Sequence, residues 1–157
     1  MNKKVLNISI VAVAVVAMFI GLKATDIKLF VIPESESVNG SLFLLQDKNT
    51  ANDYVVFEYN KIDYKNYHRG KLFIKKIGCD SGQHLLVQDY KVVCDGRTLA
   101  TIFQKNNEGQ VLPTYRYDGI IPNDSFFALG EHLKSFDSRY FGLVDKKQIT
   151  KSARRIF

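Results

Sequence analysis

Two serines and an adjacent pair of lysines are the residues best suited to chemistry in this chain of 157 residues. Ser35 and Ser37 lie in residues 32–38, IPESESV. If that segment is extended, both hydroxyls project from one face, because side chains alternate along a strand. A serine hydroxyl is a poor nucleophile unless a neighbouring base removes its proton. The pair therefore needs a base from elsewhere in the chain.

Lys75 and Lys76 could supply that base from the apolar run LFIKKIG, residues 72–78. Neighbouring side chains of a strand point to opposite faces, so one of the two lysines must face the core side. Burial disfavours the charged ammonium and lowers its pKa, by several units when the group is fully buried. A lysine that is neutral near physiological pH can accept the proton of a serine hydroxyl.

Three segments together resemble the signatures of the type I signal peptidases, the S26 serine proteases. Residues 135–142, SFDSRYFG, are similar to the C-terminal signature of that family. Residues 74–82, IKKIGCDSG, look like the box that contains the catalytic lysine, and residues 32–38 look like the box whose second serine is the nucleophile. The three occur in the family's order. The resemblance covers roughly residues 30–145 and implies a serine endopeptidase.

The resemblance assigns the chemistry to three side chains. Ser37 would attack the scissile carbonyl carbon, and Lys75 would accept its proton and later deliver it to the leaving amine. The backbone N–H of Ser37 and the hydroxyl of Ser35 would stabilise the tetrahedral oxyanion. Loss of one such donor typically costs about a hundredfold or more in rate.

The same resemblance assigns supporting roles to three residues of the C-terminal signature. Ser135 would hydrogen-bond the lysine amine and orient it. Asp137 and Arg139 would form an ion pair that supports the site without doing chemistry.

The chain departs from the family pattern at several positions. Asn39 stands where the nucleophile box has proline, so Ser35 and Ser41 are rival nucleophiles. Lys76 replaces the usual arginine, and the GDN that precedes the signature reads GEH in residues 130–132. These changes leave the substrate preference open. They also motivate an alternative, a non-catalytic membrane-tethered assembly protein with a degenerate peptidase fold.

The small size, the single anchor and the DSRYFG run look closest to the TraF-type peptidases of conjugative transfer. That resemblance implies exported precursor proteins, such as pilin, as partners. Two outcomes stay open, simple hydrolysis and transfer of the acyl group to a pilin amino terminus. A regulator of the LexA type, which uses the same dyad, is disfavoured because the chain has an apolar N-terminal segment and no DNA-binding module.

Residues 1–22 are expected to form an N-terminal transmembrane anchor. Lys3 and Lys4 precede an uncharged apolar run, residues 5–22, which at 1.5 Å per residue just crosses a bilayer core of about 30 Å. The lysines predict a cytoplasmic N-terminus, which puts residues 23–157 on the periplasmic, extracytoplasmic side of the cytoplasmic (inner) membrane. A signal peptide cleaved after Ala24 is the alternative reading.

Charge and cysteine content add further expectations. With 22 Lys and Arg against 16 Asp and Glu the net charge is +6, but the positive charges are spread, so no nucleic acid partner is expected. Cys79 and Cys94 could form a disulfide outside the cytoplasm, which spacing alone does not decide. No metal or cofactor is expected, because no histidine stands at a zinc-like spacing. The basic residues near the C-terminus predict a solvated tail or lipid contact: Lys146, Lys147, Lys151, Arg154 and Arg155.

The chain after the anchor reads as a mainly β domain with antiparallel strands, like that of a signal peptidase. Short apolar or alternating runs separated by turn residues predict the strands, and Asp95-Gly96 predicts a tight hairpin. Residues 104–119 are expected to form an exposed loop, and residues 135–142 an irregular segment. Strands are expected at residues 27–32, 42–45, 54–59, 72–77, 84–87, 91–94, 97–103 and 125–129.

Overall fold

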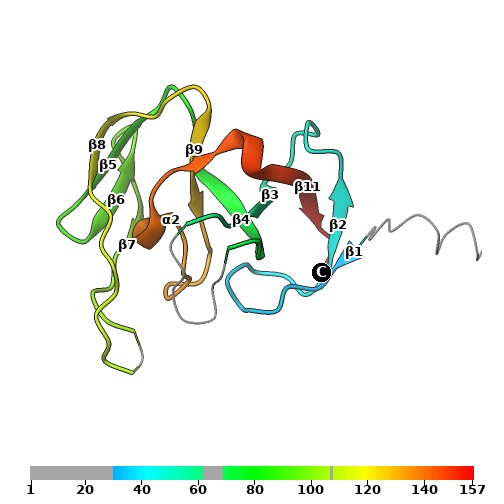
Figure 1. The fold of residues 1–157 in the computed structure, drawn as a ribbon, viewed down its shortest axis with the longest axis horizontal. Coiled ribbons are helices and arrows are strands. Elements are labelled where there is room, and N and C mark those ends of the chain that lie inside the picture. The colour runs from blue at the N-terminus through cyan, green and yellow to red at the C-terminus, as the bar shows by residue number, and fades with distance from the viewer. Residues whose placement is uncertain (1–29, 62–68, 107) are drawn as a thin grey trace, which may run out of the picture.

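The protein folds into two antiparallel β-sheets, seen in a computed structural model that describes residues 30–61, 69–106 and 108–157. The seven-stranded sheet has the order β1-β2-β11-β3-β4-β9-β10, and the four-stranded sheet has the order β7-β6-β5-β8. In Figure 1 the smaller sheet and the β1–β2–β11 end of the larger sheet lie at opposite sides, with β4 and β9 between them. The strands are β1 Phe30–Val31, β2 Phe43–Gln46, β3 Tyr54–Glu58, β4 Leu72–Cys79, β5 His84–Gln88, β6 Lys91–Cys94, β7 Arg97–Thr101, β8 Tyr117–Ile120, β9 Ser125–Leu129, β10 Val144–Asp145 and β11 Ile149–Arg155.

Two apolar cores hold the sheets. The larger core takes buried side chains from β3, β4 and β9 of one sheet and from β5 and β6 of the other, so it joins the two sheets. Aromatic rings dominate it, and Phe57 and Phe126 are fully buried in edge-to-face contact at 5.7 Å. The smaller core lies at the other end of the large sheet and contains Val38, Phe43, Tyr54, Val56 and Ala153.

The prediction of a mainly antiparallel β domain is confirmed, and most strands fall within one or two residues of the expected bounds. The expected loop of residues 104–119 does not extend as far as predicted, because β8 begins at Tyr117. The irregular segment expected at residues 135–142 contains one short helix, α2 (Ser138–Phe141), which Asp137 caps at its N-terminus.

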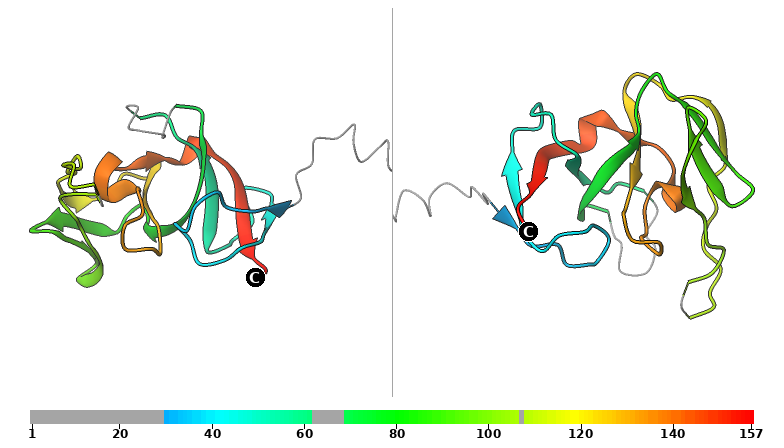
Figure 2. Two further views of the ribbon diagram at one scale, coloured as in Figure 1. Left: turned by 90° about the horizontal axis from the view of Figure 1, so that it is seen from below. Right: turned by 180° about the vertical axis from the view of Figure 1, so that it is seen from behind.

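The prediction of a solvated C-terminal tail is wrong, whereas lipid contact of the basic residues stays a prediction. Residues 149–155 form β11, which pairs with β2 on one side and β3 on the other inside the large sheet. Lys151, Arg154 and Arg155 are exposed, whereas Ser152 and Ala153 are buried. A 3₁₀ turn, Lys146–Gln148, precedes the strand. The end of the chain lies beside the start of β2 (Figures 1 and 2), where the Ile156 N–H donates to the carbonyl of Leu42.

The predicted transmembrane anchor, residues 1–22, lies outside the described residues. Within the part of the chain that the structure describes, no helix has the length and apolar character needed to cross a bilayer.

Cys79 and Cys94 form a disulfide with a Cα–Cα distance of 5.8 Å. The bond ties the end of β4 in the large sheet to the end of β6 in the small one. Both cysteines are buried, so the bond belongs to the larger core that joins the sheets.

Replacing both cysteines by alanine is expected to lower the free energy of unfolding by about 3 kcal/mol, the entropic value for a loop closed over a separation of 15 residues. Urea denaturation of the purified full-length chain, followed by tyrosine fluorescence, measures the change. Dithiothreitol should lower the stability of the unaltered protein by a similar amount and leave the double variant unaffected. A double variant as stable as the parent would contradict the structural role of the bond.

Candidate active site

Strand β4 carries Lys75 into the protein interior. Alternation along the strand places Lys75 on the same face as Phe73, and the Lys75 side chain is only 4% exposed. Its Nζ atom lies 5.7 Å from the centre of the Phe73 ring. Lys76 points to the opposite face, where it pairs with Glu131. The adjacent lysines therefore have different surroundings, and Lys75 is the buried one.

The environment of Lys75 favours the neutral amine. The pKa of Lys75 is lowered from its ordinary value of 10.5 to about 8, chiefly by burial. The negative charge of Asp137 raises this pKa, and the positive charge of Arg139 lowers it. A general base works best when its pKa lies near the working pH. Lys75 is thus suited to accept a proton in mildly alkaline solution.

Ser135 is the hydrogen-bond partner of the buried amine. Lys75 Nζ donates to Ser135 Oγ at 3.0 Å, and both side chains are buried. Ser135 stands in residues 130–137, the loop that leads from β9 to α2. A Cβ added to Gly130 would collide with Ser135 Oγ, so Ser135 needs glycine at position 130. The contact orients the amine, which otherwise rotates freely on a long side chain.

Asp137 and Arg139 fix this loop through a buried ion pair. Arg139 Nη2 lies 2.8 Å from Asp137 Oδ2, with the two side chains 1% and 0% exposed. Asp137 Oδ2 also accepts from the backbone N–H of Gly130 at 2.8 Å. The guanidinium group donates to four backbone carbonyls, those of Thr101, His132, Leu133 and Ser135. The pair thereby fixes the path of the loop that carries Ser135.

Ser35 and Ser37 lie in a turn, although an extended segment was expected. Their hydroxyls are nevertheless in contact, with 2.6 Å between the two Oγ atoms. The following residue, Val38, is 3% exposed and packs into the smaller core. Burial of a valine side chain stabilises by about 1.5 kcal/mol or more, so Val38 anchors the turn.

The loop of residues 130–137 also contacts the backbone of Ser37. The carbonyl oxygen of Ser37 accepts from the N–H of Glu131 at 2.8 Å and from the N–H of His132 at 3.3 Å. It lies 2.9 Å from the position that a Cβ of Gly130 would occupy. One loop therefore contacts both the segment of the candidate nucleophile and the buried lysine.

Within the described residues, no hydrogen bond joins Ser37 Oγ to Lys75 Nζ; the hydroxyl contacts Ser35 and the amine contacts Ser135. Hydrogen bonds between catalytic groups are often long in substrate-free enzymes and tighten in the complex. The rival serine, Ser41, is held elsewhere, since its backbone N–H donates to the carbonyl of Phe157, two residues after β11. The arrangement can support acyl transfer through a serine and a neutral lysine.

Glu131 is the site residue that the sequence did not reveal. In the sequence Glu131 is only a departure from the GDN pattern, yet in the structure its carboxylate bonds Asn39, Tyr54 and Lys76. Those partners lie far from it along the chain, so no local spacing points to the contact.

Comparison with known proteins decides the family. The model of the signal peptidase family, peptidase S26, matches residues 3–157. The chain belongs to this family. It is therefore a serine endopeptidase of the signal peptidase type, and signal peptidases act on exported precursor proteins.

Among solved structures, the chain is similar to a signal peptidase I from Enterococcus faecalis V583, with 19% sequence identity and a TM-score of 0.42. The match covers 68% of this chain and 97% of that one. The search of curated proteins finds no significant match. The signal peptidase family model spans all three segments described above.

Proposed function

We propose that this signal peptidase cleaves exported precursor proteins with a Ser37–Lys75 dyad. The observation that carries the proposal is the buried amine of Lys75, whose pKa is lowered to about 8. This amine donates to Ser135, and the loop that contains Ser135 also binds the Ser37 carbonyl. A lysine without a role in proton transfer gains nothing from such burial, because desolvation of a charge is costly.

The proposed reaction proceeds through an acyl-enzyme. Ser37 Oγ attacks the scissile carbonyl carbon while its proton passes to the neutral Lys75 Nζ. The backbone N–H of Ser37 and the Ser35 hydroxyl stabilise the oxyanion. The C–N bond then breaks, and the Lys75 ammonium returns the proton to the leaving amine. A water molecule next loses a proton to Lys75 and attacks the ester carbonyl carbon. The C–O bond to Ser37 then breaks, and the Lys75 ammonium returns its proton to Ser37 Oγ, which frees Ser37 and the new carboxyl end.

The proposed setting is the outer face of the cytoplasmic membrane, with residues 1–22 as the anchor and residues 23–157 as the extracytoplasmic domain. The apolar N-terminal run and the lysines before it support this placement. The DSRYFG run supports a TraF-type substrate, a pilin or another precursor of a conjugative transfer or secretion system. Mass spectrometry of the product separates hydrolysis from acyl transfer, because only hydrolysis adds water.

The pH dependence of processing tests the dyad. The neutral form is the base, so the rate should rise with pH through the pKa of Lys75, about 8. The neutral fraction grows from about one tenth at pH 7 to about nine tenths at pH 9, and the single-turnover rate should therefore increase roughly tenfold. The assay uses the full-length chain in detergent micelles and a precursor peptide with small residues before the cut. A rate that is flat or falls over this range would contradict the proposal.

The alternative is a non-catalytic assembly protein with a degenerate peptidase fold. Asn39 at the proline position favours it, as does the lack of a hydrogen bond between Ser37 and Lys75 in the described residues. A scaffold of this kind would bind precursors without turning them over at any pH, whereas the peptidase converts them in a Ser37-dependent reaction.

A further inference from the structure

Asn39 makes a backbone contact that ties the turn after Ser37 to the loop at residue 131. Its backbone N–H donates to Glu131 Oε2 at 2.6 Å. This hydrogen bond restrains the backbone of the turn that follows Ser37.

The carboxylate of Glu131 is held on both oxygens. Oε2 also accepts from the Tyr54 hydroxyl at 2.9 Å, and Oε1 lies 2.7 Å from Lys76 Nζ. The Glu131 side chain is 15% exposed. Burial raises the pKa of Glu131, but the hydrogen bonds from Lys76, Asn39 and Tyr54 outweigh it and leave the pKa lowered. Glu131 is therefore an anion with a fixed orientation at neutral pH.

Glu131 contacts the nucleophile segment on both sides of Val38. Its backbone N–H donates to the carbonyl of Ser37, and its carboxylate accepts from Asn39. Hydrogen bonds to an ionised acceptor are roughly twice as strong as those between neutral groups. With Val38 buried between these two contacts, the backbone that follows Ser37 is fixed at successive residues.

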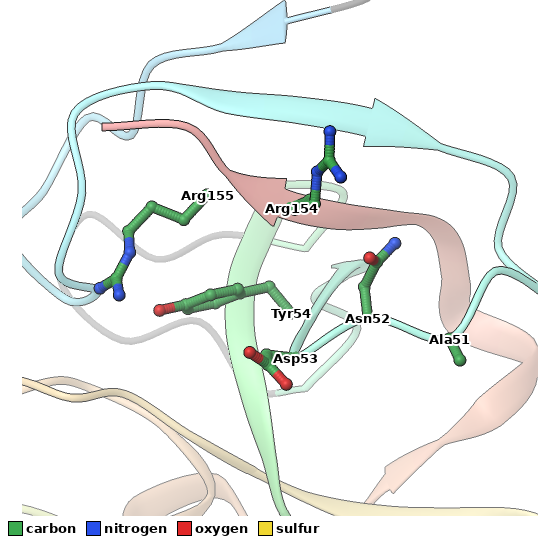
Figure 3. A pocket seen from close by; sticks show the side chains of 6 residues that line it. All are labelled: Ala51, Asn52, Asp53, Tyr54, Arg154 and Arg155. Carbon is green, nitrogen blue, oxygen red and sulfur yellow. The ribbon is translucent and has the colours of Figure 1, made fainter.

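Strand β11 fixes the next part of the same segment. Arg155 Nη1 donates to the carbonyl of Asn39 at 2.9 Å, and the Phe157 carbonyl accepts from Ser41 N–H at 2.7 Å. Tyr54 from β3 and Arg155 from β11 line one pocket of about 260 Å³ and extend toward the same side of it (Figure 3). Arg155 of β11 and Glu131 of the loop thus both contact Asn39, and Tyr54 of β3 contacts the Glu131 carboxylate.

We propose that Glu131 is a positioning residue for Ser37, and that it acts through its hydrogen bonds to the backbone on both sides of Val38. The inference rests on the proposed function of Ser37 as nucleophile. Glu131 contacts neither the Ser37 hydroxyl nor the Lys75 amine, so it acts through the backbone of the turn. A displacement of about 1 Å at a reacting atom can cost a hundredfold in rate.

Hydrogen exchange tests the restraint without any substrate. In the full-length chain, the amides of residues 38–40 should exchange about tenfold faster in Glu131→Ala than in the unaltered protein, since loss of the bond opens the turn. Asp80→Ala, which removes another ion-paired carboxylate at the far end of β4, should leave these amides unchanged. Equal exchange in Glu131→Ala and the parent would overturn the inference.

Kinetics test the positioning of Ser37. Glu131→Ala should lower kcat for the precursor peptide about 100-fold with KM nearly unchanged, and Glu131→Gln, which keeps an oxygen acceptor for Asn39, should recover about tenfold of that loss. The pH midpoint should stay near that of the parent, because Asp137 and Arg139, the charges that act on Lys75, are untouched.

Two variants of residue 39 distinguish the effect of its backbone hydrogen bond on kcat from the effect of its side chain. Asn39→Pro removes the N–H, and Asn39→Ala keeps it. Glu131→Ala should cost as much kcat in the Asn39→Ala background as in the parent, and at most a few-fold in the Asn39→Pro background. Equal losses in both backgrounds would refute the inference. Absence of Ser37-dependent processing in the parent would refute the proposed function instead, and hydrogen exchange would still decide the restraint.

Discussion

Replacing Ser37 by alanine or Lys75 by methionine is expected to lower the rate of precursor processing by on the order of 10⁴-fold or more. Ser37→Ala removes the attacking oxygen, and Lys75→Met removes the group that accepts its proton. Methionine has nearly the length of lysine and no charge, so it fits the apolar surroundings beside Phe73. Both variants should therefore remain folded, which circular dichroism and thermal melting can verify, while gel analysis follows precursor conversion.

The two rival serines serve as controls. Ser35→Ala should retain measurable turnover at about 10²- to 10³-fold below the parent, because it removes one oxyanion donor and leaves the nucleophile. Ser41→Ala should behave like the parent, since the structure places Ser41 beside the end of β11. Retained processing in Ser37→Ala or in Lys75→Met, or complete loss in Ser41→Ala, would end the dyad assignment.

Replacing Arg139 by methionine is expected to have the largest effect on stability, a loss of about 3–5 kcal/mol in the free energy of unfolding. The change leaves the carboxylate of Asp137 buried without its ion partner, and it removes donors from four backbone carbonyls. Urea denaturation at pH 7.5, about half a unit below the Lys75 midpoint, measures the loss.

An exposed ion pair provides the comparison for Arg139. Lys146 and Asp80 lie 2.8 Å apart with side chains 35% and 45% exposed, so Lys146→Met should cost less than about 1 kcal/mol. Arg139→Met should also move the pH midpoint of processing upward, because the Arg139 charge contributes to the lowered pKa of Lys75. A loss in Arg139→Met no larger than in Lys146→Met would contradict the structural role of the buried pair.

The contrast between Lys75 and Lys76 could be predicted from sequence because it depends only on the alternation of a strand. The choice of Lys75 as the buried residue came from the resemblance of its segment to a family box. The strand itself was recognisable from the apolar residues around the two lysines. The alternation of side chains along a strand depends only on neighbouring residues, so it can be predicted from the sequence alone.

The features that escaped prediction depend on contacts between distant parts of the chain. Strand β11 was missed because its buried residues, Ser152 and Ala153, are small and stand among exposed basic residues, so no apolar period marks the strand. The sequence predicts an extended segment at Ser35 and Ser37, because nothing local shows that residues 130–132 contact a turn there. Glu131 was missed for the same reason.

The titration of the Lys75 amine in the full-length chain tests the central claim most directly. Nuclear magnetic resonance of protein labelled with ¹⁵N in the lysine side chains follows each Nζ with pH, and Lys75→Met identifies the signal of Lys75. We expect that signal to titrate near pH 8, with the rate of processing rising at the same midpoint. A midpoint near the ordinary lysine value of 10.5, or a processing rate that does not follow the titration, would contradict the assignment of Lys75 as the base.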